Sequence, residues 1–395
     1  MPKDDINYKF TENGLVYDFY DVFVPAENFR QPALWVWGAS SSLGNNNATD
    51  APTPITTFAG GTNWKSVSAG GNFTAAVKTD GTLWNWGAAN LGQLGTNDNT
   101  PTRVTPVTTF AGGTNWKQVS CGYQHTAAVK TDGTLWTWGF SGQGRLGNNF
   151  PFGSVNVPSL TFAGGTDWKQ VSCGEGHTAA IKTDGSLWVW GYNNTAQLGV
   201  NDTTDRNIPV TTFAGGTTWK QVACGGNHTA AIKTDGTLWS WGVGTDGRLG
   251  TNDTTTRSTP VTTFAGGTDW KQVVCGRYHT AAIKTDGSLW IWGKNQYGAL
   301  GVSDENNRST PVTTFAGGNN WKQVSCGNEL NAAIKTDGTL WVWGVVWTNG
   351  RLGINVTGFG VFRNTPVTTF AGGNNWKQVF AGNTHMGAIK YQPDP

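Results

Sequence analysis

Two short motifs alternate along this chain, and their spacing restricts the fold more than any other feature. LWxWG begins at seven positions that lie 49 to 52 residues apart, namely Leu34, Leu83, Leu135, Leu187, Leu238, Leu289 and Leu340. WK(Q/S)V also begins at seven positions, namely Trp64, Trp116, Trp168, Trp219, Trp270, Trp321 and Trp376. A repeat of roughly 50 residues cannot bury both of its faces alone, so its copies must pack on one another.

One full repeat, residues 116–162, is typical of four short β-strands with the sequences WKQVSC, HTAAVK, TLWTWG and VPSLTF. The second and third are joined by Thr131, Asp132 and Gly133, a tight turn in which glycine supplies the positive φ. Four antiparallel strands in a repeat of this length are the signature of a propeller blade. We therefore predict an all-β, seven-bladed β-propeller with about three core tryptophans per blade.

Neither end of the repeat array makes a whole blade. The N-terminal part supplies only LWVWG and TPITTF, and the C-terminal part only WKQV and HMGAIK. Left apart, these half-blades would expose unpaired strand edges, which favour aggregation. We predict that they combine into one composite blade, residues 34–58 with 376–390, which closes the ring. The domain boundaries expected are an N-terminal arm at 1–33, the propeller at 34–390 and a C-terminal tail at 391–395.

The motifs around LWxWG resemble those of the RCC1 repeat family. CGxxHTAA occurs as Cys121-Gly122 followed by His125-Thr126-Ala127-Ala128, and GxxxxGxLG as Gly87, Gly92 and Leu94-Gly95. The resemblance covers about residues 34–390. It implies a protein-interaction role, which in this family includes nucleotide exchange on a small GTPase, protein inhibition, ubiquitin-ligase modules and phage structural proteins. The near-identity of the copies is similar to the arrays encoded by tailed phages, including those of cyanobacteria.

The cysteines and histidines, which are the residue types most able to act as nucleophiles, bases or metal ligands, recur at most once per blade. This recurrence favours structural roles. Five cysteines share one repeat position and are expected to be small buried residues rather than metal ligands: Cys121, Cys173, Cys224, Cys275 and Cys326. Their odd number favours a reducing compartment. Five histidines are expected to form hydrogen bonds within their own blades: His125, His177, His228, His279 and His385. No known catalytic motif occurs, so we predict no enzymatic activity, no cofactor and no metal.

The charge and hydropathy patterns exclude two classes of partner. A net charge of +2 on 395 residues is too small to favour electrostatic binding of nucleic acid. No apolar run is long enough to insert into a membrane, and MPKDDINYKF has no character of a secretory signal.

The connections that differ between copies lie on one predicted face of the ring, and they are the expected site of protein binding. Candidate contacts there are Tyr123, Arg277, Tyr278 and Tyr297. Two loops are unusually aromatic, which indicates either a protein contact or local packing over the rim. They contribute Trp347, Phe359, Phe362, Phe140, Phe150 and Phe152. Arg145, Arg248 and Arg351 share one repeat position and are expected to be structural.

The N-terminal arm is expected to be an attachment element. Residues 1–30 hold three basic and six acidic side chains, so their net charge is 3 − 6 = −3. The arm could wrap the propeller, dock on a partner or join a second copy into an oligomer. Its candidate contacts are Tyr17, Phe19, Tyr20, Phe23 and Phe29.

Three functional hypotheses follow from these patterns. The first is a structural, tail or host-adhesion component of a phage virion, assembled in the host cytoplasm, with other virion proteins or a host surface molecule as partners. The second is a cytoplasmic RCC1-type regulator that binds a small GTPase or another soluble protein. The third is a carbohydrate-binding propeller that uses exposed aromatic residues such as Tyr278 and Tyr297.

Overall fold

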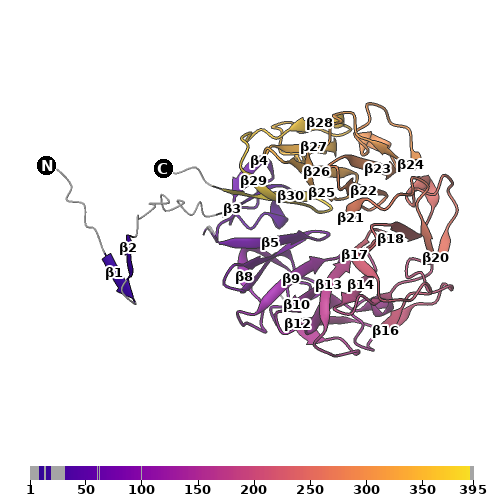
Figure 1. The fold of residues 1–395 in the computed structure, drawn as a ribbon, viewed down its shortest axis with the longest axis horizontal. Helices are drawn as coiled ribbons and strands as arrows, with labels where there is room; N and C mark the ends of the chain where they lie inside the picture. Colours follow the sequence, from indigo (N-terminus) through magenta and orange to yellow (C-terminus); the bar gives the residue numbers. More distant parts are fainter. Residues whose placement is uncertain are drawn as a thin grey trace.

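Seven four-stranded antiparallel sheets stand around a central axis (Figure 1). The computed structural model describes residues 9–12, 15–18, 32–59, 61, 63–98 and 100–391. The predicted seven-bladed propeller is confirmed. No helix among these residues is long and apolar enough to cross a bilayer.

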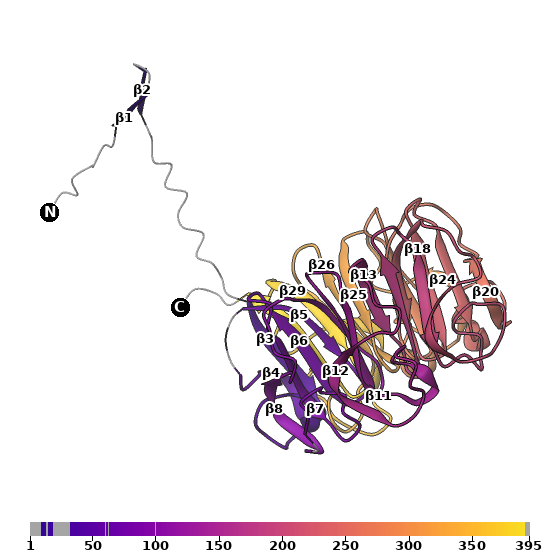
Figure 2. The ribbon, with the colours of Figure 1, turned by 90° about the horizontal axis from the view of Figure 1, so that it is seen from below.

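The composite blade has the strand order β29-β30-β3-β4, so the predicted ring closure is also confirmed. Its strands are β29 (Trp376–Ala381), β30 (His385–Tyr391), β3 (Pro32–Gly38) and β4 (Ala51–Thr56). The β30–β3 pair runs in unbroken register from Tyr391 opposite Pro32 to His385 opposite Gly38. In Figure 2 the indigo strand β3 lies beside the yellow C-terminal strands. The strands extend slightly beyond the predicted bounds, to Pro32 and Tyr391.

The six continuous blades each take four consecutive strands, from the axis outward. The first three comprise β5 (Trp64–Ala69), β6 (Phe73–Lys78), β7 (Leu83–Ala88) and β8 (Thr102–Thr108); β9 (Trp116–Cys121), β10 (His125–Lys130), β11 (Leu135–Phe140) and β12 (Ser154–Leu160); and β13 (Trp168–Cys173), β14 (His177–Lys182), β15 (Leu187–Gly191) and β16 (Arg206–Thr211). The next three comprise β17 (Trp219–Cys224), β18 (His228–Lys233), β19 (Leu238–Gly242) and β20 (Arg257–Thr262); β21 (Trp270–Cys275), β22 (His279–Lys284), β23 (Leu289–Gly293) and β24 (Arg308–Thr313); and β25 (Trp321–Cys326), β26 (Leu330–Lys335), β27 (Leu340–Val345) and β28 (Phe362–Thr368).

Short elements complete the described chain. Single turns of 3-10 helix lie in four connections: η1 (Ser40–Ser42), η2 (Gly142–Gly144), η3 (Thr245–Gly247) and η4 (Gln296–Gly298). Within the N-terminal arm, β1 (Lys9–Glu12) and β2 (Leu15–Asp18) pair as an antiparallel hairpin. No repeat motif had indicated this hairpin.

The hydrophobic core lies between blades rather than within them. In one typical cluster, Val77 and Leu83 of one blade pack against Trp116, Val119 and Trp138 of the next. Since each blade covers one face of its neighbour, the stability of every blade depends on the closed ring.

The prediction of three core tryptophans per blade is wrong for the first tryptophan of LWxWG. Trp136 is half-buried, whereas Trp116 and Trp138 are buried. The exposed part of Trp136 is covered by a lysine: the Lys130 Nζ lies 4.5 Å from the Trp136 ring and 4.6 Å from the Trp116 ring. This cation–π contact recurs in all seven blades, because the second strand of each blade carries a lysine beside both indoles.

Glutamine side chains join neighbouring inner strands, whose backbones do not pair with one another. The Gln118 Nε2 donates to the Val171 carbonyl oxygen at 3.1 Å, and its Oε1 accepts from the Val171 N–H at 3.2 Å. The same two-bond bridge is made by Gln170, Gln221, Gln272 and Gln323. Each bridge satisfies backbone groups that would otherwise face the channel unpaired.

The first continuous blade carries Ser66 where five others carry this bridging glutamine, and its Oγ has no hydrogen-bond partner. We expect Ser66→Gln to raise the free energy of unfolding by about 1 kcal/mol, because it restores the bridge to Val119. Differential scanning calorimetry should show a melting temperature raised by about 1–2 °C for a protein of this size. The reverse change, Gln170→Ser, should lower the melting temperature by a similar amount, and a fall with Ser66→Gln would contradict the bridge.

The histidines bond between blades, which corrects the expectation of bonds within each blade. The His125 Nε2 lies 2.9 Å from Oγ1 of Thr178, the second residue of the next blade's second strand. Because that hydroxyl donates its own proton to the Arg145 carbonyl oxygen, the Nε2–H of His125 must be the donor. At the seam, His385 bonds Thr74 in the same way at 2.7 Å. The sequence could not show this, because the partner lies about one repeat away.

Candidate functional site

The two faces of the ring carry different kinds of connection, as predicted. We call the side with the TDG and FAGG connections the turn face, and the side with the first-to-second-strand turns and the long third-to-fourth-strand loops the loop face. On the turn face, successive blades touch closely: a Cβ on Gly133 would lie 2.0 Å from the Thr166 carbonyl oxygen, and the glycine has φ +80°. This contact requires glycine in every copy, so the identity of the TDG turns has a geometric cause.

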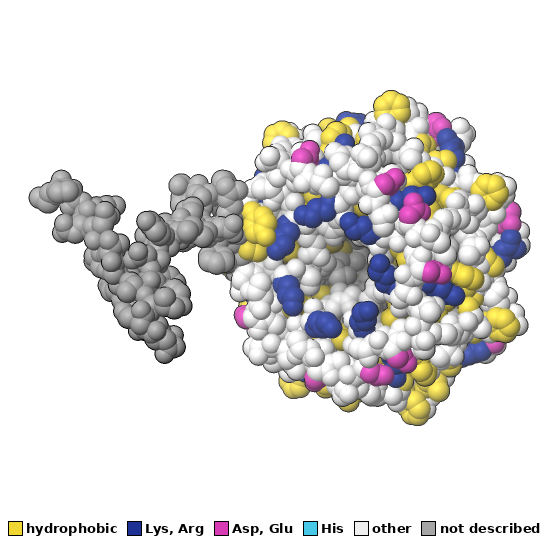
Figure 3. All heavy atoms as spheres, viewed as in Figure 1, with side chains coloured by type: hydrophobic (Ala, Val, Ile, Leu, Met, Phe, Trp, Pro, Cys, Tyr) yellow, Lys and Arg dark blue, Asp and Glu magenta, His cyan; other side chains and the backbone are white. Residues whose placement is uncertain are grey.

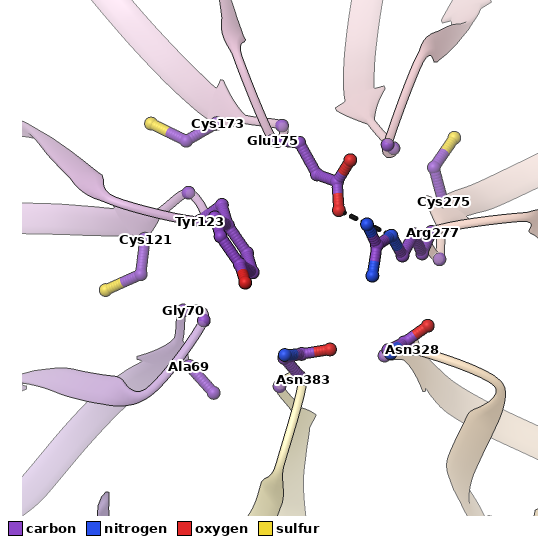
Figure 4. Close-up of a pocket in the computed structure, with 18 of the residues that line it drawn as sticks. Ala69, Gly70, Cys121, Tyr123, Cys173, Glu175, Cys275, Arg277, Asn328 and Asn383 are labelled. Carbon is purple, nitrogen blue, oxygen red and sulfur yellow. Dashed lines mark ion pairs between the residues drawn. The ribbon is translucent and has the colours of Figure 1, made fainter. Parts of the chain in front are cut away.

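On the loop face, the short turns of the blades converge around the mouth of the central channel (Figure 4). They carry different residues at equivalent places. Tyr123, Glu175 and Arg277 come from three different blades and point toward one another across the axis (Figure 4). The Arg277 Nε lies 2.6 Å from the Glu175 Oε1, forming an ion pair between blades that are not adjacent. These residues line a hollow of about 100 Å³.

The ion pair is only partly shielded from water. Burial raises the pKa of Glu175 above its ordinary value, while the nearby arginines Arg277, Arg248 and Arg145 oppose that shift. Arg145 also donates from Nη1 to the Glu175 carbonyl oxygen at 3.1 Å, which fixes the turn that carries the carboxylate. Tyr123 is 38% exposed, so an aromatic surface and an ion pair are both accessible at the mouth.

Tyr278 lies in a group of cations next to this mouth. Its ring is 4.7 Å from the Lys294 Nζ, 5.1 Å from the Arg277 guanidinium and 5.2 Å from that of Arg248. Lys294 in turn forms an ion pair with Glu329 at 3.0 Å. The predicted candidates Tyr123, Arg277 and Tyr278 therefore belong to one continuous surface, which we call the mouth cluster together with Glu175 and Lys294.

A second group of predicted residues forms a separate aromatic cluster. Trp347 packs edge-on against Tyr297 at 6.2 Å and against Phe359 at 5.0 Å between ring centroids. Phe362 lies 6.3 Å from Tyr297. Phe359 is 81% exposed, whereas the other three are half-buried. Local packing therefore accounts for three of these aromatics, and Phe359 alone is presented to solvent.

The third predicted group lies beside another loop on the same face. Phe150 and Phe152 are 52% and 74% exposed. Phe152 and Phe140 line a groove that also contains Asp205. Phe140 is half-buried beneath the Arg145 guanidinium, which lies 4.7 Å from its ring.

The remaining recurrent residues are structural. Cys121, Cys173, Cys224 and Cys326 are buried and Cys275 is half-buried, and burial raises the pKa of the Cys173 thiol to about 12. Such a thiol is a poor nucleophile at neutral pH. Arg145 and Arg351 each bond a carbonyl of the next blade's turn, Glu175 and Asn383 respectively. Within the described ranges, no group of three or more His, Cys, Asp or Glu side chains is arranged to hold a metal ion.

Four of the five candidate contacts of the N-terminal arm lie outside the described residues. Tyr17 lies in β2, opposite Phe10 in the hairpin register. Phe19, Tyr20, Phe23 and Phe29 lie outside the described residues.

Seven phenylalanines were not singled out from the sequence. Each ends the TTF or LTF segment before Ala-Gly-Gly and is more than 60% exposed on the turn face: Phe58, Phe110, Phe162, Phe213, Phe264, Phe315 and Phe370. They stand singly, one per blade, which is ordinary for surface aromatics. Glu175 was not among the predicted contacts, although it is an acidic side chain where the other copies have glycine, tyrosine, arginine or asparagine.

Comparison with known proteins gives consistent results. The family model described as the RCC1-like domain matches residues 30–269 and 153–393. The chain is 34% identical over 338 residues to the ultraviolet-B receptor UVR8 of Arabidopsis thaliana, covering 84% of this chain and 76% of that protein. It is 28% identical over 308 residues to the mitochondrial RCC1 domain-containing protein RUG3 of the same plant, covering 75% and 68%.

Solved structures share the fold. The crystal structure of human WBSCR16 has a TM-score of 0.79 at 22% identity, covering 91% of this chain and 100% of that one. Yeast RCC1 (Prp20), solved bound to Kap60, has a TM-score of 0.79 at 18% identity, covering 92% and 90%. At these identities the likeness concerns the fold alone.

Proposed function

Because this chain belongs to the RCC1-like domain family, we propose that it is a non-enzymatic protein-binding scaffold whose loop face holds the partner. The mouth cluster is the observation that carries this proposal. Equivalent turn positions carry Tyr123, Glu175 and Arg277, and these three side chains form one asymmetric surface on an otherwise repetitive ring. Tyrosine and arginine are among the residue types most enriched at the energetic centres of protein interfaces. Yeast RCC1 (Prp20), which shares this fold, was solved bound to another protein, Kap60.

The finer form of the proposal is attachment within a virion or to a host surface. The near-identical repeats and the acidic, aromatic arm support a role as a particle component assembled in the host cytoplasm. This form predicts that the protein is present in purified particles, which mass spectrometry would detect. Its absence from particles would favour the alternative, a cytoplasmic regulator, and accelerated nucleotide release from a small GTPase would identify that alternative.

Carbohydrate binding is disfavoured by the packing of its proposed aromatics. Sugar stacking needs a free aromatic face, but Tyr278 is approached by three cations and Tyr297 is packed between Trp347 and Phe362. A glycan array tests this hypothesis directly.

The proposed function is tested by changing the mouth cluster in the full chain. We expect Arg277→Glu to weaken partner binding at least tenfold, because it breaks the pair with Glu175 and places two like charges together. Tyr123→Ala should weaken the free energy of partner binding by about 1–2 kcal/mol, as expected for an aromatic residue at an interface. The measurement is affinity capture of virion or host proteins, followed by titration of the captured partner.

The matched control is Arg257→Glu, which makes the same charge change on the outer strand β20. The control should retain the partner. Equal binding by wild type and Arg277→Glu would place the partner elsewhere than the mouth cluster.

A further inference from the structure

Each blade presents one exposed lysine at the start of its inner strand, directly after the buried tryptophan of WK(Q/S)V. The seven residues, which we call the lysine ring, are Lys65, Lys117, Lys169, Lys220, Lys271, Lys322 and Lys377. They recur in every copy, although an exposed position imposes no packing requirement for lysine.

The lysine ring surrounds the channel on the turn face. The inner strands begin on this face and line the channel, and the glutamine that follows five of the seven lysines bridges to the neighbouring strand. These five lysines are thus held on strands one glutamine side chain apart from the next. Figure 3 shows Lys and Arg side chains gathered around the central hollow.

The charges of the lysine ring are not neutralised by neighbouring carboxylates. No ion pair involves these seven side chains within the described part of the chain. The acidic groups nearby are engaged elsewhere: Asp167 and Asp269 pair with Lys182 and Lys284, which lie in second strands. The aspartates of the TDG turns accept from their own turns, as Asp132 does from the Thr134 N–H and hydroxyl. Seven positive charges therefore converge in a protein whose net charge is only +2.

We propose that the lysine ring is a binding site for a compact anion that carries several phosphate groups. A monovalent anion could meet only one or two of the ammonium groups, whereas an anion with phosphates spread around its body could meet most of them. Lysine binds phosphate as a flexible point charge, so exact ligand symmetry is not required. The channel below is lined by polar side chains such as Gln118, Gln170 and Ser120, and also by valine, alanine and cysteine side chains.

The site is independent of the proposed function, because it lies on the turn face and the mouth cluster lies on the loop face. Failure of one proposal leaves the other intact.

Isothermal titration of the full chain with inositol hexakisphosphate tests the proposal. We expect saturable binding with one anion per ring at 50 mM NaCl. Affinity should fall at least tenfold at 300 mM NaCl, because the Debye length shortens below about 6 Å. The triple variant Lys117→Gln, Lys220→Gln, Lys322→Gln should weaken binding at least tenfold without changing the melting temperature of the free protein.

The control variant removes the same number of cationic groups from the starts of the outer strands, where each of them pairs with an aspartate, as Arg206→Gln, Arg257→Gln, Arg308→Gln. It should bind as tightly as wild type. Equal losses in the two triple variants would show diffuse attraction and overturn the site. A polyglutamate peptide binding as tightly as inositol hexakisphosphate would overturn the phosphate specificity, and no saturable binding at 50 mM NaCl would overturn the proposal altogether.

Discussion

A chain that ends at Thr384 is expected to lose the closed ring and to unfold or aggregate at temperatures where the full chain is folded. The truncation removes β30, which lies between β29 and β3 and pairs with both. It also removes Met386, Ala388 and Ile389 from buried positions, and the bond from His385 to Thr74 of the first continuous blade. Loss of a central strand with its core residues is expected to cost more than the roughly 5–15 kcal/mol by which most domains are stable.

Circular dichroism and size-exclusion chromatography measure this outcome. A chain that ends at Tyr391 is the control and should melt like the full chain, since it keeps every strand of the composite blade. A circular permutant that joins Tyr391 to Pro32 through a short linker and begins at Trp64 should also fold, because it keeps every strand pair of the propeller. A chain ending at Thr384 that melts within a few degrees of wild type would contradict the role of the seam.

Acid is expected to unfold the protein above the pH at which the aspartates of the TDG turns are protonated. Burial lowers the pKa of His177 and His385 to about 3 and that of His279 to about 4, and it also lowers the pKa of His125 and His228 well below the ordinary value of histidine. In each ring the Nδ1, where a second proton would bind, has no hydrogen-bond partner.

The direction in which pH changes the free energy of unfolding follows from the difference in proton binding between the folded and unfolded chain. Below about pH 6.5 the unfolded chain binds protons on its histidines that the folded ring excludes, so the free energy of unfolding falls as the pH falls. Five histidines together give a slope of up to about 7 kcal/mol per pH unit, until the folded pKa values are reached. Since domains are stable by about 5–15 kcal/mol, we expect unfolding between about pH 4 and pH 5.5.

Tryptophan fluorescence against pH measures the transition. The chain itself supplies the matched variant, because Leu330 stands in place of histidine where the next blade has Met386 in place of threonine. Replacing His228 and Thr280 by Leu and Met should reduce the slope by about one fifth and shift the midpoint to lower pH. Hydrogen bonds from their own turns lower the pKa values of the TDG aspartates. These aspartates therefore change the free energy of unfolding only below about pH 4. A midpoint below pH 4 that this variant leaves unchanged would therefore assign acid unfolding to carboxylates.

The number of blades and the closing seam could be predicted from the sequence because both depend on the order of motifs along the chain. The half-repeats at the two ends leave no free strand edge only if they pair with each other in one blade. Leu34 and Trp376 mark the two parts of that blade. The bonds between blades could not be predicted in this way. Gln118 and His125 bond residues about 50 positions away, and the repeat spacing does not reveal whether a polar side chain turns toward its own blade or the next.

The binding surface was predicted in part, for a similar reason. Divergence between copies identified Tyr123, Arg277 and Tyr278, which the structure brings together. The pairing of Arg277 with Glu175 crosses the axis between non-adjacent blades, and only the ring geometry determines that distance. The lysine ring was overlooked because its residues do not diverge, and an averaged net charge hides charges that symmetry concentrates at one place.

The composite blade also determines how the molecule would respond to mechanical force. Pro32 and Tyr391 lie opposite each other at one end of the antiparallel β3–β30 pair. Tension applied through the segments before Pro32 and after Tyr391 would therefore separate the two strands one hydrogen bond at a time, rather than load all the bonds in parallel. A force-spectroscopy trace should show an early, low-force opening at this seam, after which the six continuous blades would lose their closure.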